Sequence, residues 1–461
     1  MRSVLVRSTA VLALAACASV PAPGREAEAE AALPASYRIA TDGTATPALW
    51  WRAFGEPELA DYVERALSQN LDLTASTARV AQARARLRIA GASLLPSVNA
   101  SVGAQTSYSG AEQQRLVDGF VTTESWRTAT SGSVQISYEL DLFGANRAGR
   151  RSAAASYDAQ RYADDALRIT TAADTASAYF SVLAGAQSLA IAQSSLEALE
   201  RISRIVQLRY DEGAVSGQDL ARQRAEVAQA RSQIPSLEAQ LDASRQALAL
   251  LLAEAVPPAP LENRDLLSFN VPTIATGLPA DLLLRRPDLR SAQANLAAAD
   301  ADVAAARAAL FPSIDLSASV GTSSLSDPAA TASFAGSLVQ PIFQGGRLRG
   351  QLAERLARLD ELDADYRRTV LTAFQEVERA LSGLQASAAQ EQALITAAEA
   401  AAEAFRIAQV RYEDGADDLL NLLDAERSLS SARSGLVTAR FDRLTAALDL
   451  FRALGGDWSS S

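Results

Sequence analysis

Few residues of this chain could carry chemistry at a catalytic centre. The 461 residues include no histidine and one cysteine, Cys17. Zinc sites rely mainly on histidine and cysteine, and Ser-His-Asp or Cys-His arrangements need a histidine base. No metal site, cofactor or nucleophilic triad is therefore expected. Carboxylate catalysis stays possible in principle but has no positive signal, so we expect a protein that is not an enzyme.

The single cysteine lies where a secretory signal would end. Two arginines precede an apolar run up to Ala16 that is too short to cross a bilayer as a helix. The sequence Leu-Ala-Ala-Cys at 14–17 resembles a bacterial lipobox, in which the cysteine becomes the mature N-terminus and carries acyl chains such as palmitate. Residues 1–16 are then a lipoprotein signal peptide, and Ala18 is typical of outer-membrane lipoproteins. The alternative is an ordinary signal peptide with an incidental cysteine.

Composition excludes two further classes of protein. With 48% hydrophobic and 21% charged residues, the chain can bury a substantial core and is not mainly disordered. Its net charge is −11 and its basic residues do not cluster. Because binding to a phosphate backbone needs a clustered basic face, no nucleic-acid partner is expected.

A repeat is the strongest internal signal. Leu-Leu-Pro-Ser-Val at 94–98 returns as Leu-Phe-Pro-Ser-Ile at 310–314, and Arg-Tyr-Asp-Glu-Gly-Ala at 209–214 returns as Arg-Tyr-Glu-Asp-Gly-Ala at 411–416. Two motifs that recur in the same order indicate a duplicated unit. The predicted organisation is an extended, lipidated N-terminal segment at 17–55, a first repeat at 56–256, a linker at 257–271, a second repeat at 272–456 and a tail at 457–461.

Each repeat contains two stretches in which apolar and polar residues alternate, as in strands that expose their two faces to different surroundings. In the first repeat the alternation begins after Pro96, pauses in a polar loop and resumes. In the second it begins after Pro312, and Pro341 lies near its end. Strands are predicted at about 97–108, 131–143, 313–322 and 333–343.

The rest of each repeat predicts helices of unusual length. No proline occurs between 145 and 211, so one helix of nearly 70 residues could form, about 100 Å long. The chain should turn at Gly213 and return from about 218 to 252 as an antiparallel hairpin. A second hairpin should run from about 348 to 414, turn at Gly415, and return from 419 to 454.

The strands could form a soluble sheet with one buried face, and the residues alone leave that interpretation open. They are separated, however, by long helices that share no face with them. Strands in hydrocarbon must close into a barrel, and known barrels begin at about eight strands. A chain with four membrane strands would have to oligomerise: two copies give eight strands and three give twelve. Polar faces would line a wet lumen and apolar faces would meet lipid.

Several motifs carry a family resemblance through their order and spacing. They are the lipobox, Gly-Leu-Pro-Ala-Asp-Leu-Leu-Leu-Arg-Arg-Pro-Asp-Leu at 277–289, Leu-Phe-Pro-Ser at 310–313, Gln-Pro-Ile-Phe-Gln-Gly-Gly-Arg at 340–347, and Arg411-Tyr412 with Gly415. Over nearly the whole mature chain, they resemble the outer membrane factor family, the TolC and OprM group, and its NodT-type lipoproteins in particular.

This resemblance implies a mainly α protein with a transmembrane β-barrel. Three copies would close a twelve-stranded barrel in the outer membrane of a Gram-negative bacterium, and their long helical hairpins would form an α-barrel across the periplasm. The lipid-anchored homotrimer would be the exit duct of a tripartite efflux or export system. Its implied partners are outer-membrane lipid, a periplasmic adaptor (membrane fusion) protein and an inner-membrane pump, for which the NodT-type resemblance favours the resistance-nodulation-division (RND) type.

The resemblance also implies a periplasmic gate at Leu420 and Asp424. These residues are four apart on one helix and therefore share a face. In a trimer, three leucines would form a dry constriction and three carboxylates an acidic ring that favours cations and responds to pH. The alternative is that Asp424 is only a solvated surface residue.

The two hairpin tips are the implied adaptor contacts, with Gly213, Gly415, Arg209, Arg411 and Tyr412 as candidate residues. Glycine at both turns also has a plain structural explanation, because it adopts the left-handed conformation that ends helices. Some relatives close the entrance with a tyrosine and an arginine near these turns. Tyr412 matches the tyrosine, but Asp417 stands in place of the arginine and cannot form the same bridge.

Two rival functions remain. The chain could be a lipid-tethered periplasmic coiled-coil scaffold or adaptor with no channel, although adaptors usually combine a single helical hairpin with a lipoyl-like or barrel domain. A membrane-anchored enzyme is the second rival, with no recognisable site. Heat-resistant oligomers and channel conductance would distinguish a duct from both.

Overall fold

The computed structural model describes residues 33–39, 49–116, 119–256, 264–273, 277–325 and 329–456. Cys17, the expected signal peptide and the expected tail at 457–461 lie outside the described residues. The chain forms two compact units, and neither is one of the sequence repeats. Unit 1 takes its described residues from 33–75, 164–290 and 367–456, and unit 2 takes its residues from 76–163 and 291–366. Each unit therefore contains segments of both repeats.

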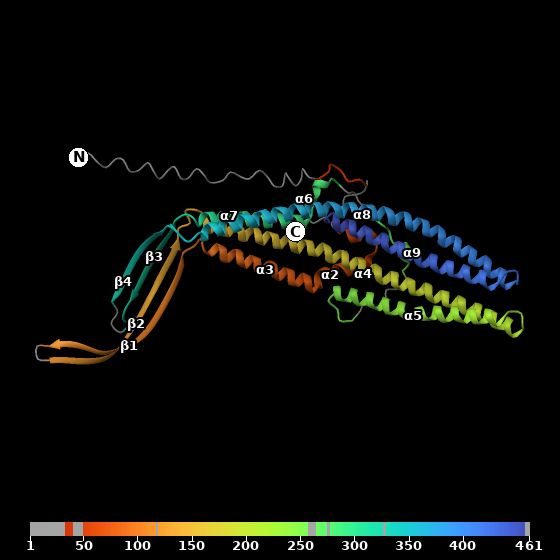
Figure 1. The fold of residues 1–461 in the computed structure, drawn as a ribbon, viewed down its shortest axis with the longest axis horizontal. Helices are drawn as coiled ribbons and strands as arrows, with labels where there is room; N and C mark the ends of the chain where they lie inside the picture. Colours follow the sequence, from red (N-terminus) through yellow and green to blue (C-terminus); the bar gives the residue numbers. More distant parts are fainter. Residues whose placement is uncertain are drawn as a thin grey trace. The chain divides into compact units, whose positions relative to one another are not determined.

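Two helical hairpins dominate unit 1 (Figure 1). Helix α4 (Ala145–Asp211) is followed by α5 (Gly217–Leu251), and α8 (Arg347–Glu413) is followed by α9 (Leu419–Ala453). We call them hairpin 1 and hairpin 2. Every end lies within one residue of the prediction, because alanine-rich sequence favours helix and the glycines at 213 and 415 end α4 and α8. Helix α5 continues through Pro235. The predicted class of long helical hairpins with four strands is confirmed.

An aromatic core joins four segments of unit 1. Trp50, in the 3-10 helix η2 (Trp50–Phe54), stacks on Phe451 of α9 at 5.0 Å between ring centroids. Phe54 contacts Phe180 of α4 at 5.5 Å, and Phe180 meets Phe269 of the linker edge-on at 5.4 Å. The prediction of an extended segment up to residue 55 is therefore wrong at its end. Burial of three aromatic rings stabilises a helical turn there, and α2 (Pro57–Gln69) follows it.

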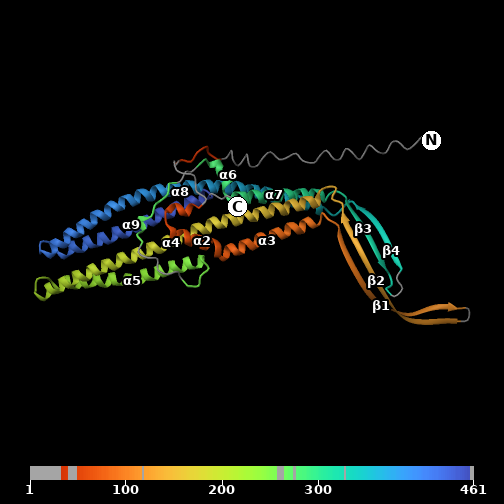
Figure 2. The same ribbon diagram turned by 180° about the vertical axis from the view of Figure 1, so that it is seen from behind.

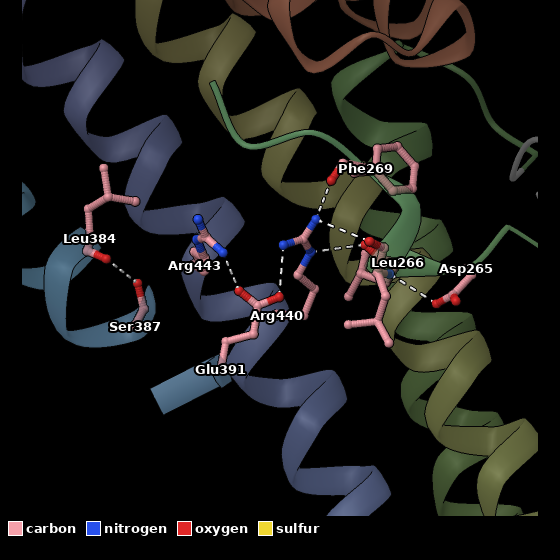
Figure 3. A network of polar contacts seen from close by, with 9 residues as sticks. Asp265, Leu266, Phe269, Leu384, Ser387, Glu391, Arg440 and Arg443 are labelled. Carbon is pink, nitrogen blue, oxygen red and sulfur yellow. Dashed lines mark hydrogen bonds and ion pairs between the residues drawn. The ribbon is translucent and has the colours of Figure 1, made fainter. Parts of the chain in front are cut away.

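A buried ionic cluster fastens the linker to hairpin 2 (Figure 3). The guanidinium of Arg440 donates to the carbonyls of Leu266 at 3.2 Å and Leu267 at 3.3 Å, and to that of Phe269. It also donates to Glu391 at 2.8 Å, and Arg443 donates to the other oxygen of Glu391 at 2.6 Å. The linker turn that receives these bonds is the 3-10 helix η3 (Leu266–Ser268).

The same linker is bonded to hairpin 1. Gln187 of α4 donates to Asp265 at 3.0 Å and accepts from the backbone amide of Leu266 at 3.3 Å. The second half of the predicted linker is therefore an ordered brace between the two hairpins, in addition to connecting the repeats.

Unit 2 contains an antiparallel sheet of four strands in chain order. They are β1 (Ser97–Leu116), β2 (Gly119–Glu139), β3 (Ser313–Thr322) and β4 (Ala330–Val339). Helix α3 (Leu71–Ala92) precedes the first pair, and α7 (Pro287–Ala308) precedes the second. Figure 2 shows the strands in this order from the opposite side.

Five predicted strand ends are wrong: 108, 131, 143, 333 and 343. The polar loop expected after residue 108 is strand on both sides of the turn, because ladder hydrogen bonds come from the backbone and do not require apolar side chains. Strand β2 ends at Glu139, not near 143, because Asp141 caps α4 by accepting from the amides of Asn146 and Arg147 at 3.2 and 2.8 Å. Strand β4 lies at 330–339, not at 333–343, and ends before Pro341.

The strand register sorts the side chains by face. One cross-strand row aligns Val98, Ile136, Ala318 and Phe334, and the large members of this row are exposed. On the other face, hydroxyls pair across strands, at 2.9 Å between Ser101 and Ser133 and at 2.8 Å between Ser319 and Ser333. The sheet thus presents an exposed apolar face and a hydroxyl-rich face.

Helix α4 also contains an 18-residue stretch that could cross a membrane by length and composition alone, the one such helix in the described chain. A third of that stretch is buried. Because the core helix of a soluble domain passes the same test, this stretch is weak support for a membrane span.

Replacing Glu391 with alanine should destabilise unit 1 by about 3–5 kcal/mol, because the guanidinium of Arg440 would keep its burial and lose its anionic partner. Thermal and denaturant unfolding in detergent, followed by circular dichroism, measures this change. The control is Glu403→Ala on the same helix, which removes an exposed pair with Arg406 and should leave the unfolding midpoint unchanged. Equal midpoints for Glu391→Ala and wild type would show that the cluster does not stabilise the fold.

Candidate functional site

The two hairpin tips end in the same turn. Gly213 and Gly415 both have φ of 74°, the left-handed conformation. Behind them, the amide of Ala214 bonds to the carbonyl of Arg209, and the amide of Ala416 bonds to that of Arg411, each at 2.8 Å. These are the long bonds of a Schellman motif. A side chain at either glycine would meet nothing within 4 Å, so the requirement is conformational and not steric.

The returning helices also begin alike. Ser216 caps α5, its hydroxyl accepting from the amide of Asp219 at 3.2 Å. Asp418 caps α9, its carboxylate accepting from the amide of Asn421 at 2.9 Å. Both caps satisfy amides that the first turn of a helix leaves unpaired. The tips are therefore two copies of one structure, as the sequence repeat predicts.

Arg209 connects the two tips. Its Nη2 donates to the carbonyls of Tyr412 at 2.8 Å and Glu413 at 3.1 Å, and its guanidinium lies 4.5 Å from the centre of the Tyr412 ring. These carbonyls belong to the last turn of α8, where the helix dipole favours a cation. Burial raises the pKa of Tyr412, although the guanidinium of Arg209 opposes that shift. We call this contact the Arg209 joint.

An apolar cluster lies beside the Arg209 joint. It contains Leu199, Ile202, Val206 and Leu220 of hairpin 1 with Tyr412, Leu419, Leu422 and Leu423 of hairpin 2. Two polar bonds accompany it. Gln223 donates to the carbonyl of Leu199 at 2.7 Å in a buried bond, and Ser195 donates to Glu426 at 2.5 Å in a partly buried one. Burial raises the pKa of Glu426. Within one chain, therefore, the tips are joined by the apolar cluster and by the Arg209 joint.

Arg411 is the repeat equivalent of Arg209, but it does not cross to the other hairpin. Its Nε lies 3.3 Å from Asp417, on its own hairpin. Asn421 donates to the same carboxylate at 2.6 Å. The bond from Asn421, with that from the Asp418 amide and the nearby Arg411, lowers the pKa of Asp417. Asp417 thus holds Arg411 and makes no bridge to Tyr412.

Leu420 and Asp424 both face away from the apolar cluster. Leu420 is 45% exposed, whereas Leu419, Leu422 and Leu423 beside it are buried. Asp424 has one partner that was not predicted from the sequence: Arg427 donates to its carboxylate at 2.9 Å. Helical spacing of three residues could have revealed this pair. Asp424 is therefore a solvated acid with a cation beside it, and not an isolated carboxylate.

The contacts at the tips are hydrogen bonds, an ion pair and apolar packing, all of them non-covalent. Within the described residues, no group of three or more histidine, cysteine, aspartate or glutamate side chains is placed to hold a metal ion. The proposed lipidation site, Cys17, is not among those residues.

Known proteins resemble the chain along most of its length. The family model described as outer membrane efflux protein matches residues 62–254 and 278–456. The pyoverdine export outer membrane protein OpmQ of Pseudomonas aeruginosa is 37% identical over 98% of this chain and 96% of its own length. The toluene efflux pump outer membrane protein TtgF of Pseudomonas putida is 35% identical over 89% of this chain and 86% of its own length.

A solved structure agrees in fold. The open state of the MtrE outer membrane channel of Neisseria gonorrhoeae is 29% identical and aligns with a TM-score of 0.81, covering 92% of this chain and 96% of MtrE. The chain is thus an outer-membrane channel protein for efflux or export that extends into the periplasm. Each match of the family model also lies within one sequence repeat. By these similarities the chain belongs to the outer membrane efflux protein family.

Proposed function

We propose that three copies of the chain form the duct, with their sheets closed as one twelve-stranded barrel. The supporting observation is a four-stranded sheet with an exposed apolar face, whose outer strands β1 and β4 each pair on one side only within the described residues. Unpaired backbone groups are costly in hydrocarbon, so β4 of one copy pairs with β1 of the next. The family resemblance supports three copies over two. The hydroxyl-rich face then lines the lumen.

In this proposal the duct conducts and does not catalyse. A periplasmic adaptor binds the hairpin tips around Gly213, Gly415 and the Arg209 joint, and an RND-type pump in the inner membrane supplies the substrate. OpmQ and TtgF are named for pyoverdine and toluene, two dissimilar compounds, at similar identity to this chain. Because relatives named with such different compounds are about equally similar to this chain, we infer a general duct whose substrate is selected by the pump.

The gate of this duct is formed by Leu420 and Asp424. Their exposure on one face of α9, opposite the apolar cluster, supports a position toward the lumen. Three Leu420 side chains then exclude water, and three Asp424 carboxylates favour cations. Arg427 moderates this acidic ring, because each carboxylate has a guanidinium within hydrogen-bonding distance. Opening requires the tips to move apart.

Single-channel recording in planar bilayers tests this gate. Wild-type protein should give small, cation-selective steps. Leu420→Ala should increase the conductance at least twofold by widening the constriction, and Asp424→Ala should reduce cation selectivity. Arg427→Ala should strengthen selectivity, because it leaves the carboxylate ring unopposed. A protein that sediments as a monomer and forms no channels would contradict the duct and favour a tethered periplasmic scaffold.

Lipidation of Cys17 has a separate test. Cells labelled with radioactive palmitate should yield labelled wild-type protein, and Cys17→Ser should abolish the label because no other cysteine is present. Ser19→Cys in the Cys17→Ser background is the matched control, since it restores a thiol outside the lipobox. Equal labelling of wild type and Cys17→Ser would contradict the lipid anchor.

A further inference from the structure

The two tips are equivalent in sequence but differ in their surroundings. Tyr412 is 2% exposed because Arg209 and hairpin 1 cover it, whereas its repeat equivalent Tyr210 is 43% exposed. Likewise, Arg209 binds the neighbouring tip, whereas the side chain of its equivalent Arg411 is 57% exposed and bound to Asp417. The repeat thus offers two equivalent contacts. Within one chain the contact of Arg209 with Tyr412 is formed, and the equivalent contact of Arg411 with Tyr210 is not.

A closed ring supplies the missing half. If the chain forms the trimer proposed above, on which this inference rests, then hairpin 2 of each subunit meets hairpin 1 of the next. Such head-to-tail contacts close when rotation completes a ring. The contact within a subunit runs from Arg209 of hairpin 1 to Tyr412 of hairpin 2. Continuing in the same direction, the next contact runs from Arg411 of hairpin 2 to Tyr210 of the neighbouring hairpin 1.

We propose that Arg411 is a two-position latch between subunits, bound either to Asp417 of its own hairpin or to the tip around Tyr210 of the adjacent subunit. In the second position it covers the Tyr210 ring and donates to the last carbonyls of α4, at Tyr210 and Asp211. This position holds the tips of adjacent subunits together. When Arg411 returns to Asp417, the contact between the subunits is lost.

The acceptors for this second position have the same geometry as those already used. The carbonyl of Tyr412 receives Arg209 while also accepting from the amide of Gly415 at 3.1 Å. The carbonyl of Tyr210 accepts from the amide of Gly213 at 2.9 Å, and among the described residues it has no second donor assigned. An arginine from outside can therefore bind at Tyr210 as Arg209 binds at Tyr412.

One pair of equivalent residues explains why only Arg411 has two positions. Two residues after the turn glycine, hairpin 1 has Val215 and hairpin 2 has Asp417. Val215 packs against the apolar cluster and offers no charge, so Arg209 is free to cross. Asp417 offers a carboxylate on the same hairpin as Arg411 and competes with the neighbouring subunit.

The apolar residues at the tips point the same way. Leu199, Ile202 and Val206 of the apolar cluster have Ala401, Ala404 and Ala408 as equivalents in hairpin 2. All three alanines are at least partly exposed, and Ala408 also packs against the apolar cluster of its own chain. Because each alanine offers less apolar area than its equivalent in hairpin 1, the joint between subunits depends more on Arg411 than the Arg209 joint depends on Arg209. Joints between subunits are then the first to separate.

Crosslinking tests the contact itself. Tyr210→Cys combined with Arg411→Cys, treated with a short bis-maleimide, should yield covalent dimers and trimers on denaturing gels. Arg209→Cys with Tyr412→Cys is the matched control and should crosslink within one chain, without a change of oligomeric mass. Each single variant controls for Cys17. A protein that is trimeric by native mass spectrometry but gives no intersubunit product would overturn the latch and leave the duct intact.

Single-channel conductance tests whether Asp417 and the neighbouring subunit compete for Arg411. This test replaces no buried residue. Asp417→Val copies hairpin 1, frees Arg411 for the neighbour, and should lower single-channel conductance at least twofold. Arg411→Ala should raise it at least twofold, and adding Asp417→Val to Arg411→Ala should change nothing further. Losing an acidic charge could itself lower cation conductance, and the double variant separates that effect. If Asp417→Val acts equally with and without Arg411, the latch is wrong.

Discussion

Strands β1 and β4 each have one edge whose backbone N–H and C=O groups pair with no other strand of the described chain. In water such edges would be solvated, but an apolar face that includes Val102 and Phe334 belongs in hydrocarbon, where water is absent. In the proposed duct the chain satisfies its backbone there by joining further copies of itself. Ring closure, the lining of the lumen and the meeting of hairpins from different subunits are parts of the same proposal.

The periplasmic end must hold the hairpins together and also let them separate. Two kinds of interaction divide these roles within unit 1. The aromatic core and the buried cluster of Arg440 and Glu391 bind the linker, α4, α8 and α9 through groups that are almost fully desolvated. At the tips, by contrast, the charged contacts are partly exposed, and exchange of partners there is what the proposed latch requires. This division suits the proposed gate, which opens when the tips move apart.

Gene duplication produced two hairpins with one design, and a few substitutions give them different roles. Both retain the glycine turn, the helix cap and the arginine and tyrosine before the turn. They differ at Val215 and its equivalent Asp417. They also differ where hairpin 1 has leucine, isoleucine and valine and hairpin 2 has alanine at the equivalent positions. In the proposed trimer, the joints within subunits are therefore stronger than the equivalent joints between subunits.

The sequence by itself determined the local structure of this protein and its family. Long helices, their ends at Gly213 and Gly415, and four strands follow from residue spacing, because backbone propensities and caps act over a few residues. It predicted the extent of the first strand pair poorly, because strand pairing uses backbone groups that residue types do not reveal.

Only the tertiary structure decided which residues meet at the tips. Arg209 and Tyr412 are separated by 203 positions, and no local pattern distinguishes that pair from Arg411 and Tyr210. The same holds for Arg440 and the linker carbonyls, 171 to 174 positions away. Contacts of this kind depend on how whole helices pack, and packing is set by the combined burial of many side chains, so spacing along the chain could not reveal them.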